Sequence, residues 1–225
     1  LMRYFTDDQP NVRMGNINAF GMNYQDLDRD LLFVMTEGDL TYAQDSGKFT
    51  HITIEEILPY PDGSAGFYFV RLEYAENIED ILAAEQAARQ KPLSEEVIIK
   101  GQLVSVTYPA LDMGEIGHAF DGDPATLVRT LETNPLKLRL IFRQAIRVDN
   151  LDVLIGGTPT RVTVSAFYEG TKLETLIQGV DAADTKRTIS LRFNPTHSVD
   201  RLEIEIYNVH DDELAHVHLW EVTLE

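Results

Sequence analysis

The sequence predicts an α+β protein in which a small α/β domain, residues 1–92, precedes an antiparallel β-sandwich, residues 95–225. Both helices that we expect lie in the first domain. The second domain contains short apolar segments at roughly 8–15-residue spacing, separated by Gly, Pro, Asn and Asp. This pattern favours a sandwich over a parallel sheet. Alternation is clearest near the end of the chain, where Leu202, Ile204 and Ile206 would face a core and the residues between them water.

The N-terminal domain is expected to begin with a strand, a helix and a hairpin. Leu31–Met35 is a short continuous apolar run, which is typical of a strand covered on both faces. Residues 37–46 are expected to form a short helix that ends at Gly47, because glycine readily adopts the left-handed conformation of a helix C-terminus. Residues 52–72 are rich in β-branched and aromatic side chains and contain the turn signal Pro-Asp-Gly at residues 61–63, so they predict a hairpin.

A second helix is the strongest helical signal in the chain. Asn77 and Asp80 resemble a capping box, an apolar face follows them, and the pattern ends before Pro92. The polar residues 90–94 after it are the expected linker between the two domains.

The second domain is expected to contain seven strands. They are Val97–Tyr108, Leu136–Phe142, Val148–Ile155, Arg161–Tyr168, Thr188–Phe193, Arg201–Tyr207 and His216–Leu224.

Composition excludes several classes of function. The formal charge of −18 opposes binding to nucleic acid and to anionic lipid, and no apolar stretch approaches the roughly 20 residues that span a bilayer. The absence of cysteine excludes disulfides, thiolate nucleophiles and zinc sites built on sulfur. No Gly-x-Ser-x-Gly motif, phosphate loop or dinucleotide fingerprint occurs. We therefore expect no catalysis in this part of the protein.

Residues 95–225 resemble the discoidin-like, galactose-binding-type jelly-roll domains. The resemblance rests on residues 119–126, Ala-Phe-Asp-Gly-Asp-Pro-Ala-Thr, and on two closing segments, residues 199–206 and 219–224. Val128 stands where that family usually has Trp, which leaves Trp220 as the only Trp of the chain. The resemblance implies a jelly-roll sandwich and a noncatalytic module that binds a glycan or positions a glycosylated acceptor.

In similar modules a calcium ion lies under the loop at residues 121–126. The resemblance implies a structural calcium held by Asp121, Asp123 and Thr126, with Glu221 of the last strand completing the site. The alternative is an Asp-Gly turn whose carboxylates accept hydrogen bonds from nearby backbone amides without any metal. For the glycan itself, Arg129, Arg139 and Tyr168 are the candidate contacts.

The N-terminal part resembles soluble tails of bacterial multi-spanning glycosyltransferases that are similar to the dolichyl-phosphate-mannose protein mannosyltransferases. The resemblance rests on residues 11–15, 32–36, 60–63 and 66–71. It implies that a membrane-embedded parent chain carries the catalysis and that this region lies on the extracytoplasmic face of the membrane.

Two other functions compete with the glycan-binding module. His210, Asp212, His216 and His218 bring metal-ligand types together, and two histidines separated by one residue on a strand share a face. They raise the alternative of a metal-dependent hydrolase or lyase. The other alternative is a purely structural domain whose acidic surface meets a basic protein partner.

Overall fold

A computed structural model of the chain describes residues 17, 27, 31–183, 185–209 and 215–225. The chain divides into two compact units, residues 1–85 and 86–225. The α+β class, with a small N-terminal sheet followed by an antiparallel β-sandwich, is confirmed by the strand pairing. No helix among the described residues combines the length and the apolar character that crossing a membrane requires.

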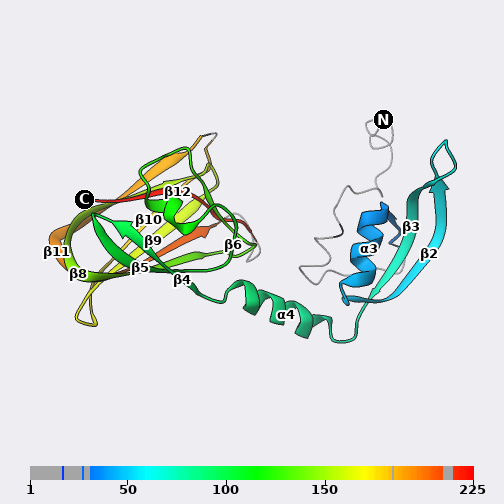
Figure 1. The fold of residues 1–225 in the computed structure, drawn as a ribbon, viewed down its shortest axis with the longest axis horizontal. Coiled ribbons are helices and arrows are strands. Elements are labelled where there is room, and N and C mark those ends of the chain that lie inside the picture. Colours follow the sequence, from blue (N-terminus) through cyan, green and yellow to red (C-terminus); the bar gives the residue numbers. More distant parts are fainter. Residues whose placement is uncertain (1–16, 18–26, 28–30, 184, 210–214) are drawn as a thin grey trace. The chain divides into compact units, whose positions relative to one another are not determined.

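The first unit contains a three-stranded antiparallel sheet in the order β1-β3-β2, with α3 packed against it (Figure 1). The elements of this region are β1 Phe33–Met35, α3 Glu37–Asp45, β2 Phe49–Pro59 and β3 Ala65–Tyr74, and α4 Ile78–Arg89 spans the boundary between the two units. A capping box starts α3, because the Thr36 hydroxyl accepts the Asp39 amide at 3.3 Å while the Asp39 carboxylate accepts the Thr36 amide at 3.1 Å. The two helices and the hairpin predicted from the sequence are confirmed.

The strand β1 is not covered on both faces, contrary to the prediction from its apolar run. It is an edge strand that pairs only with β3 among the described residues, and Val34 is 60% exposed while Met35 is 2% exposed. The reason is that the sheet is antiparallel and has one face against α3, so alternate side chains of β1 point away from the core.

The second unit is a sandwich of antiparallel strands with one short 3₁₀ helix. Its elements are β4 Leu93–Ile99, β5 Gln102–Tyr108, β6 Leu111–Met113, η1 Ile116–Phe120, β7 Val128–Thr130, β8 Leu136–Ile155, β9 Thr160–Tyr168, β10 Thr171–Val180, β11 Arg187–Asn208 and β12 His218–Leu224. β4 begins at Leu93, within the segment expected to be a linker.

Two long strands, β8 and β11, take part in both layers of the sandwich. The first layer has the order β10-β9-β11-β8-β5-β4 and pairs residues 136–141 of β8 with residues 201–206 of β11. The second layer has the order β11-β8-β12-β7-β6 and pairs residues 150–155 with residues 187–192. The chain thus passes from one layer to the other without leaving the sheet.

The sequence predicted four separate strands where the structure has these two. Residues 143–147 are exposed or half-buried, which interrupts the alternation along β8 and suggested a break at that place. β8 and β11 nevertheless continue as strands through the bend, where Ile146, Arg147 and Val148 pair with β11 and register shifts fall between Arg192 and His197 and between Val199 and Arg201. Hydrophobic periodicity reports burial, and burial is lost at the bend although both strands continue through it.

Two tight hairpins also differ from the prediction. The single strand expected over Val97–Tyr108 is two strands, β4 and β5, joined at Lys100 and Gly101, whose φ angles are 49° and 76°. The same device joins β9 to the unpredicted strand β10, at Glu169 with φ 48° and Gly170 with φ 78°. Two successive positive φ angles define the turn whose twist matches a hairpin. β10 escaped prediction because, as an edge strand, it is largely exposed and shows no apolar alternation.

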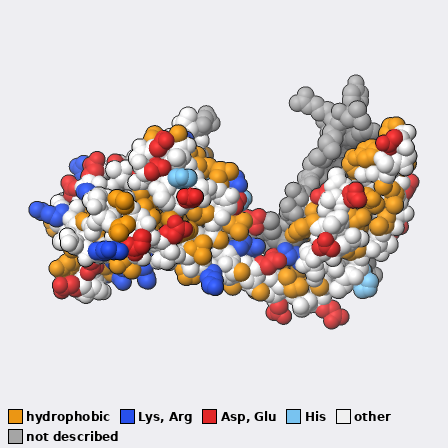
Figure 2. All heavy atoms as spheres, in the orientation of Figure 1, with side chains coloured by type: hydrophobic (Ala, Val, Ile, Leu, Met, Phe, Trp, Pro, Cys, Tyr) orange, Lys and Arg blue, Asp and Glu red, His pale blue; other side chains and the backbone are white. Residues whose placement is uncertain are grey.

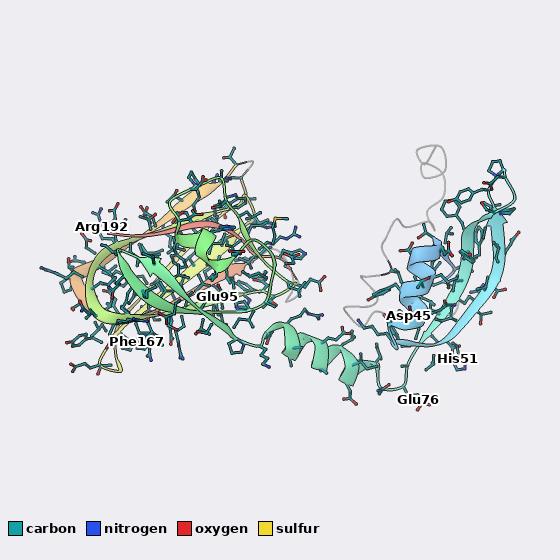
Figure 3. All side chains as sticks on the ribbon, viewed as in Figure 1. Asp45, His51, Glu76, Glu95, Phe167 and Arg192 are labelled. Atoms are coloured by element: carbon teal, nitrogen blue, oxygen red, sulfur yellow. The ribbon has the colours of Figure 1, made fainter. Side chains whose placement is uncertain are left out.

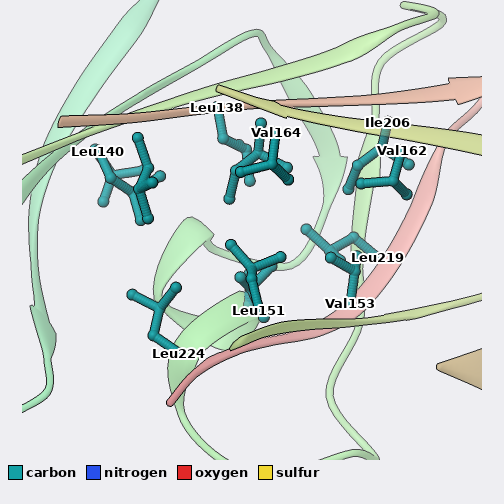
Figure 4. Close-up of a cluster of buried hydrophobic side chains, with 14 of the residues drawn as sticks. Leu138, Leu140, Leu151, Val153, Val162, Val164, Ile206, Leu219 and Leu224 are labelled. Carbon is teal, nitrogen blue, oxygen red and sulfur yellow. The ribbon is translucent and has the colours of Figure 1, made fainter. Parts of the chain in front are cut away.

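The core of the sandwich lies between the two layers (Figure 4). Leu138 and Leu140 of β8 point inward from the first layer, and Leu151 and Val153 of the same strand point inward from the second. All four are at most 2% exposed. The buried Asn134 adds polar ties, because its side chain donates to the Asn208 carbonyl at 2.8 Å and accepts the Asn208 amide at 2.9 Å.

Candidate functional site

A β-bulge in β12 shapes the candidate site. Leu219 lies opposite Ile155 of β8 and Glu221 lies opposite Leu154, so Trp220 is an extra residue without an opposite partner on β8. Bulges bend a strand and redirect its side chains. Two consecutive residues of β12, Trp220 and Glu221, are accordingly half-buried instead of one facing the core. The bulge therefore sends an indole and a carboxylate out of the same strand.

Three rings follow one another on alternate residues of β12 and of the segment just before it: His216, His218 and Trp220, which we call the β12 row. The centroids of His216 and His218 are 6.5 Å apart, and those of His218 and Trp220 are 6.0 Å apart with their planes 22° from parallel. The Lys186 ammonium lies 4.7 Å from the centroid of the indole and donates a hydrogen bond to the Pro124 carbonyl at 2.6 Å. His218 and Trp220 are thus stacked, whereas the ring planes of His216 and His218 lie 57° apart, and the row ends in a cation–π contact at Trp220.

Gly156 gives the indole its room. A Cβ atom built at Gly156 would lie 3.2 Å from Cζ3 of Trp220, which is closer than ordinary side-chain packing allows. A side chain at this position would require the ring to shift by a few tenths of an ångström. The glycine is therefore part of the site although it offers no functional group.

An ion pair borders the β12 row. Arg129 of β7 lies opposite His218 in the strand register, and its guanidinium binds the Asp112 carboxylate through two hydrogen bonds of 2.8 Å. The side chains of Arg129 and Asp112 are 29% and 20% exposed. His216 Nδ1 lies 2.7 Å from the Thr130 carbonyl and 3.7 Å from the Asp112 carboxylate, which holds the outer imidazole next to this pair. The region therefore combines ring faces with fixed donors and acceptors.

The electrostatics of the site favour a neutral His218. Burial lowers the pKa of the His218 imidazole below its ordinary value of 6.5, and the charges of Arg129 and His216 lower it further, while Asp112 opposes them. A neutral imidazole offers one N–H donor and one acceptor nitrogen. At pH 7 the centre of the row is thus an uncharged group that can both give and receive a hydrogen bond.

This pKa predicts a loss of stability in acid. Because the folded protein binds the His218 proton less tightly than the unfolded protein does, the free energy of unfolding is expected to fall as pH drops through 6.5. The penalty is absent well above pH 6.5 and complete once the pH is below the folded-state pKa. The variant His218→Gln, which has no proton to take up, is expected to show a shallower decrease of the melting temperature between neutral and acidic pH. Identical slopes for both proteins would contradict the expectation.

The loop at residues 121–126 is closed by its own hydrogen bonds. Asp121 accepts the Asp123 amide at 2.8 Å, Asp123 accepts the Ala125 amide at 2.8 Å, and Glu221 accepts the Gly122 amide at 3.0 Å. The Thr126 hydroxyl donates to the Asp123 carbonyl at 2.8 Å and lies 3.2 Å from the Asp121 carboxylate. The structure thus brings Asp121, Asp123, Thr126 and Glu221 together, in the arrangement of an Asp-Gly turn with capped amides.

Acidic side chains gather at this loop. Within the part of the chain that the structure describes, no group of three or more Asp, Glu or His side chains is placed to hold a metal ion. Burial raises the pKa of Glu221, and the nearby charges of Asp121 and Asp123 raise it further, against the lowering effect of the Gly122 amide. The alternative metal site of a hydrolase or lyase was predicted at four residues. His216 and His218 belong to the β12 row, whereas His210 and Asp212 lie outside the described residues.

The three predicted glycan contacts do not converge. Arg129 lies on β7 in the second layer, next to the row, whereas Arg139 lies on β8 in the first layer and binds Glu203 at 3.0 Å. Tyr168 ends β9 and is 38% exposed beside the turn to β10. Sequence reasoning did not assign Asp112, Lys186 or Trp220 to a ligand. The spacing His-x-His-x-Trp on the last strand was the available signal, because alternate strand residues share a face.

No protein-family model matches the sequence, and no curated protein does. Among solved structures, the family 32 carbohydrate-binding module of Clostridium perfringens NanJ, in complex with galactose, is 12% identical with a TM-score of 0.44, covering 54% of this chain and 92% of that one. The family 32 module of AlyQ, in complex with 4,5-unsaturated mannuronic acid, is 14% identical with a TM-score of 0.42, covering 59% and 98%. A GH29 fucosidase of Ruminococcus gnavus, in complex with fucose, is 13% identical with a TM-score of 0.44, covering 74% and 32%. At these values the likeness says nothing about the ligand of this chain.

Proposed function

We propose that residues 86–225 form a noncatalytic carbohydrate-binding module whose sugar lies on the β12 row. The observation that carries the proposal is the stack of His218 on Trp220 beside the bidentate pair of Arg129 and Asp112. A sugar ring has an apolar C–H face, which packs against an aromatic face, and hydroxyls that need both donors and acceptors. The row supplies the rings, and the ion pair with the neutral imidazole supplies the polar groups.

The geometry favours recognition over catalysis at this surface. Hydrolysis of a glycosidic bond uses two carboxyl groups, one on each side of the scissile bond. The carboxylate beside the row, Asp112, is held by Arg129 through both of its oxygens. An acid occupied in this way orients a ligand and is poorly placed to exchange a proton with it.

The experiment that tests this function is binding to a panel of immobilised neutral and acidic glycans. The wild-type protein is expected to bind at least one of them, and the variant Arg129→Met is expected to lose most of that binding because it removes donors and leaves Asp112 unpaired. A blank result across the whole panel would contradict the proposal and favour the structural interaction domain. Stoichiometric zinc in protein purified without added metal would favour the hydrolase.

Calcium at residues 121–126 stays a prediction, in which the ion pins the loop and does no chemistry. A ligand that binds only the folded state stabilises it by about 2.7 kcal/mol at 100 times its Kd. The melting temperature is therefore expected to be higher in millimolar calcium than in chelator, and the variant Glu221→Gln is expected to lose that difference. Equal melting temperatures for the wild type in both conditions would contradict the prediction, and the hydrogen bonds of the loop would then suffice.

The cellular setting is also part of the proposal. The resemblance of the N-terminal part to tails of membrane glycosyltransferases supports an extracytoplasmic module that positions a glycan or glycosylated acceptor for a membrane-embedded parent enzyme. Reading the coding sequence upstream of residue 1 tests this point. Several hydrophobic spans there would support it, and a complete frame without them would contradict it.

A further inference from the structure

The first layer of the sandwich carries a groove on its outer face, whereas the β12 row lies on the second layer. The groove has a volume of about 520 Å³, within the range of ligand-binding clefts. Its floor is formed by the side chains of β5, β8, β11 and β9 that point away from the core, and one wall is formed by the segment after α4. We call it the outer groove. It shares no residue with the row or with the Arg129–Asp112 pair.

Strand register places a polar row across the floor of the outer groove. Thr107, Arg139, Glu203 and Ser165 lie opposite one another on four successive strands. Arg139 and Glu203 are already paired at 3.0 Å, and the Ser165 hydroxyl lies 3.0 Å from that of Thr175. The polar side chains of these four residues therefore already have most of their hydrogen-bond partners within the protein.

The next row is not satisfied. Lys137, Glu205 and Thr163 lie opposite one another on β8, β11 and β9. Among the described residues, the Lys137 ammonium and the Glu205 carboxylate form no ion pair although they are direct cross-strand neighbours, and the Thr163 hydroxyl has no hydrogen-bond partner. One ammonium, one carboxylate and one hydroxyl group thus face the same groove and are available to bind a ligand.

Three prolines contribute apolar surface to the walls of the outer groove. Pro92, Pro109 and Pro135 line it together with Gln90 and Thr133, and Tyr108 lines it as well, at 5% exposure. The Tyr108 hydroxyl donates to Glu95 (labelled in Figure 3), which together with burial raises the pKa of Tyr108 to about 12. This hydroxyl is therefore committed to an internal bond and presents the groove with the hydrocarbon of its ring.

The charge of the outer groove points to an uncharged ligand. Lys137 and Arg139 are balanced by Glu203 and Glu205, so a formal charge on the ligand would find no net counter-charge. Figure 2 likewise shows acidic, basic and apolar side chains interspersed over the visible face of the sandwich. A hydroxyl group can both donate and accept a hydrogen bond, so hydroxyls of a ligand can bind the free donors and the free acceptors of the groove. The C–H groups of the same ligand can pack against the proline rings.

An extended peptide fits this groove less well. Peptides that are recognised through their backbone add a strand to an open sheet edge. β5, β8, β11 and β9 are interior strands of the layer, so their backbone groups already pair with neighbours on both sides. The floor offers side chains alone, across about 14 Å if four strands lie at the usual 4.8 Å spacing. That span exceeds one sugar ring.

We propose that the outer groove is a second binding site, for an uncharged oligosaccharide of several sugar units. Lys137, Glu205 and Thr163 bind its hydroxyls, and the three prolines pack against its rings. The proposal goes beyond the β12 row and is independent of it, because the two surfaces belong to different layers of the sandwich.

Titration calorimetry with maltohexaose, cellohexaose, mannohexaose, xylohexaose and laminarihexaose tests the proposal on the full chain. At least one hexaose is expected to bind, and the corresponding monosaccharide is expected not to compete. The double variant Lys137→Ala, Glu205→Ala is expected to weaken binding by at least about tenfold, since both partners bond as charged groups. Thr163→Val, which keeps the size of the side chain, provides a second variant with a smaller expected loss.

The matched control is the double variant Arg143→Ala, Glu96→Ala, which removes one cation and one carboxylate from an exposed pair in the same layer outside the groove. It is expected to bind like the wild type. The proposal that the outer groove binds an oligosaccharide would be overturned if no hexaose bound. It would also be overturned if the control variant lost as much affinity as the Lys137→Ala, Glu205→Ala variant. Loss in Trp220→Ala alone would assign the ligand to the β12 row instead. Displacement of the hexaose by reduced, carboxymethylated lactalbumin would assign the groove to unfolded polypeptide and overturn the proposal as well.

Discussion

Replacing Trp220 by alanine is expected to weaken glycan binding at the β12 row by at least about tenfold, because buried aromatic anchors carry most of the free energy at such surfaces. The variant removes the face that would contact a sugar and also the neighbour on which His218 stacks at 6.0 Å. Titration of the wild type and the variant with a glycan bound in the panel measures the effect. Trp220→Phe is expected to retain a large part of the affinity, since a smaller ring still fits beside Gly156.

Tyr60→Ala is the control for this loss. Tyr60 is an exposed aromatic residue of the hairpin between β2 and β3, in the first unit of the chain. Its removal is expected to leave glycan binding unchanged. Equal affinity in wild type and Trp220→Ala, or equal loss in both variants, would show that the row is not the binding surface.

Leu202→Ala is expected to lower the free energy of unfolding by about 2–5 kcal/mol, the range for large-to-small changes in a well-packed core. Leu202 is fully buried on β11 and lies between Leu140 of β8 and Ala166 of β9 in the strand register. The cavity would open in the first layer, below the floor of the outer groove. Chemical denaturation of wild type and variant gives the difference.

An exposed position on the edge strand of the same layer provides the comparison. Ile177→Ala on β10 removes a similar apolar side chain that is 65% exposed, so a change within about 0.5 kcal/mol is expected. A small effect of Leu202→Ala, or similar effects of the two variants, would contradict the register that buries Leu202. The two measurements together test which face of the layer is the core.

Local signals were sufficient for the first unit. The helix over residues 37–46 was predicted to end at Gly47, and the hairpin turn at residues 61–63 was predicted from a Pro-Asp-Gly sequence. Both features depend on contacts between residues close in the chain. The exposure of Val34 could not be predicted in the same way, because it depends on which face of the sheet α3 covers.

The sandwich shows the limit of periodicity. Alternation correctly identified residues 136–142 and 201–207 as strand, but the exposed bend at residues 143–147 looked like an interruption. The edge strand β10 gave no apolar pattern at all. The bend pairs with a distant segment and β10 pairs with its hairpin neighbour β9, and in both cases the exposed side chains leave no apolar pattern along the chain.

The acidic charge and the strand faces of the core could be predicted from the sequence alone, because each follows from composition or from near neighbours. The position of Trp220 depends on a bulge, and the pairing of Arg129 with Asp112 depends on the register of β6 with β7. Only the folded structure could decide these, since hydrogen bonds between remote strands choose which side chains meet on the surface.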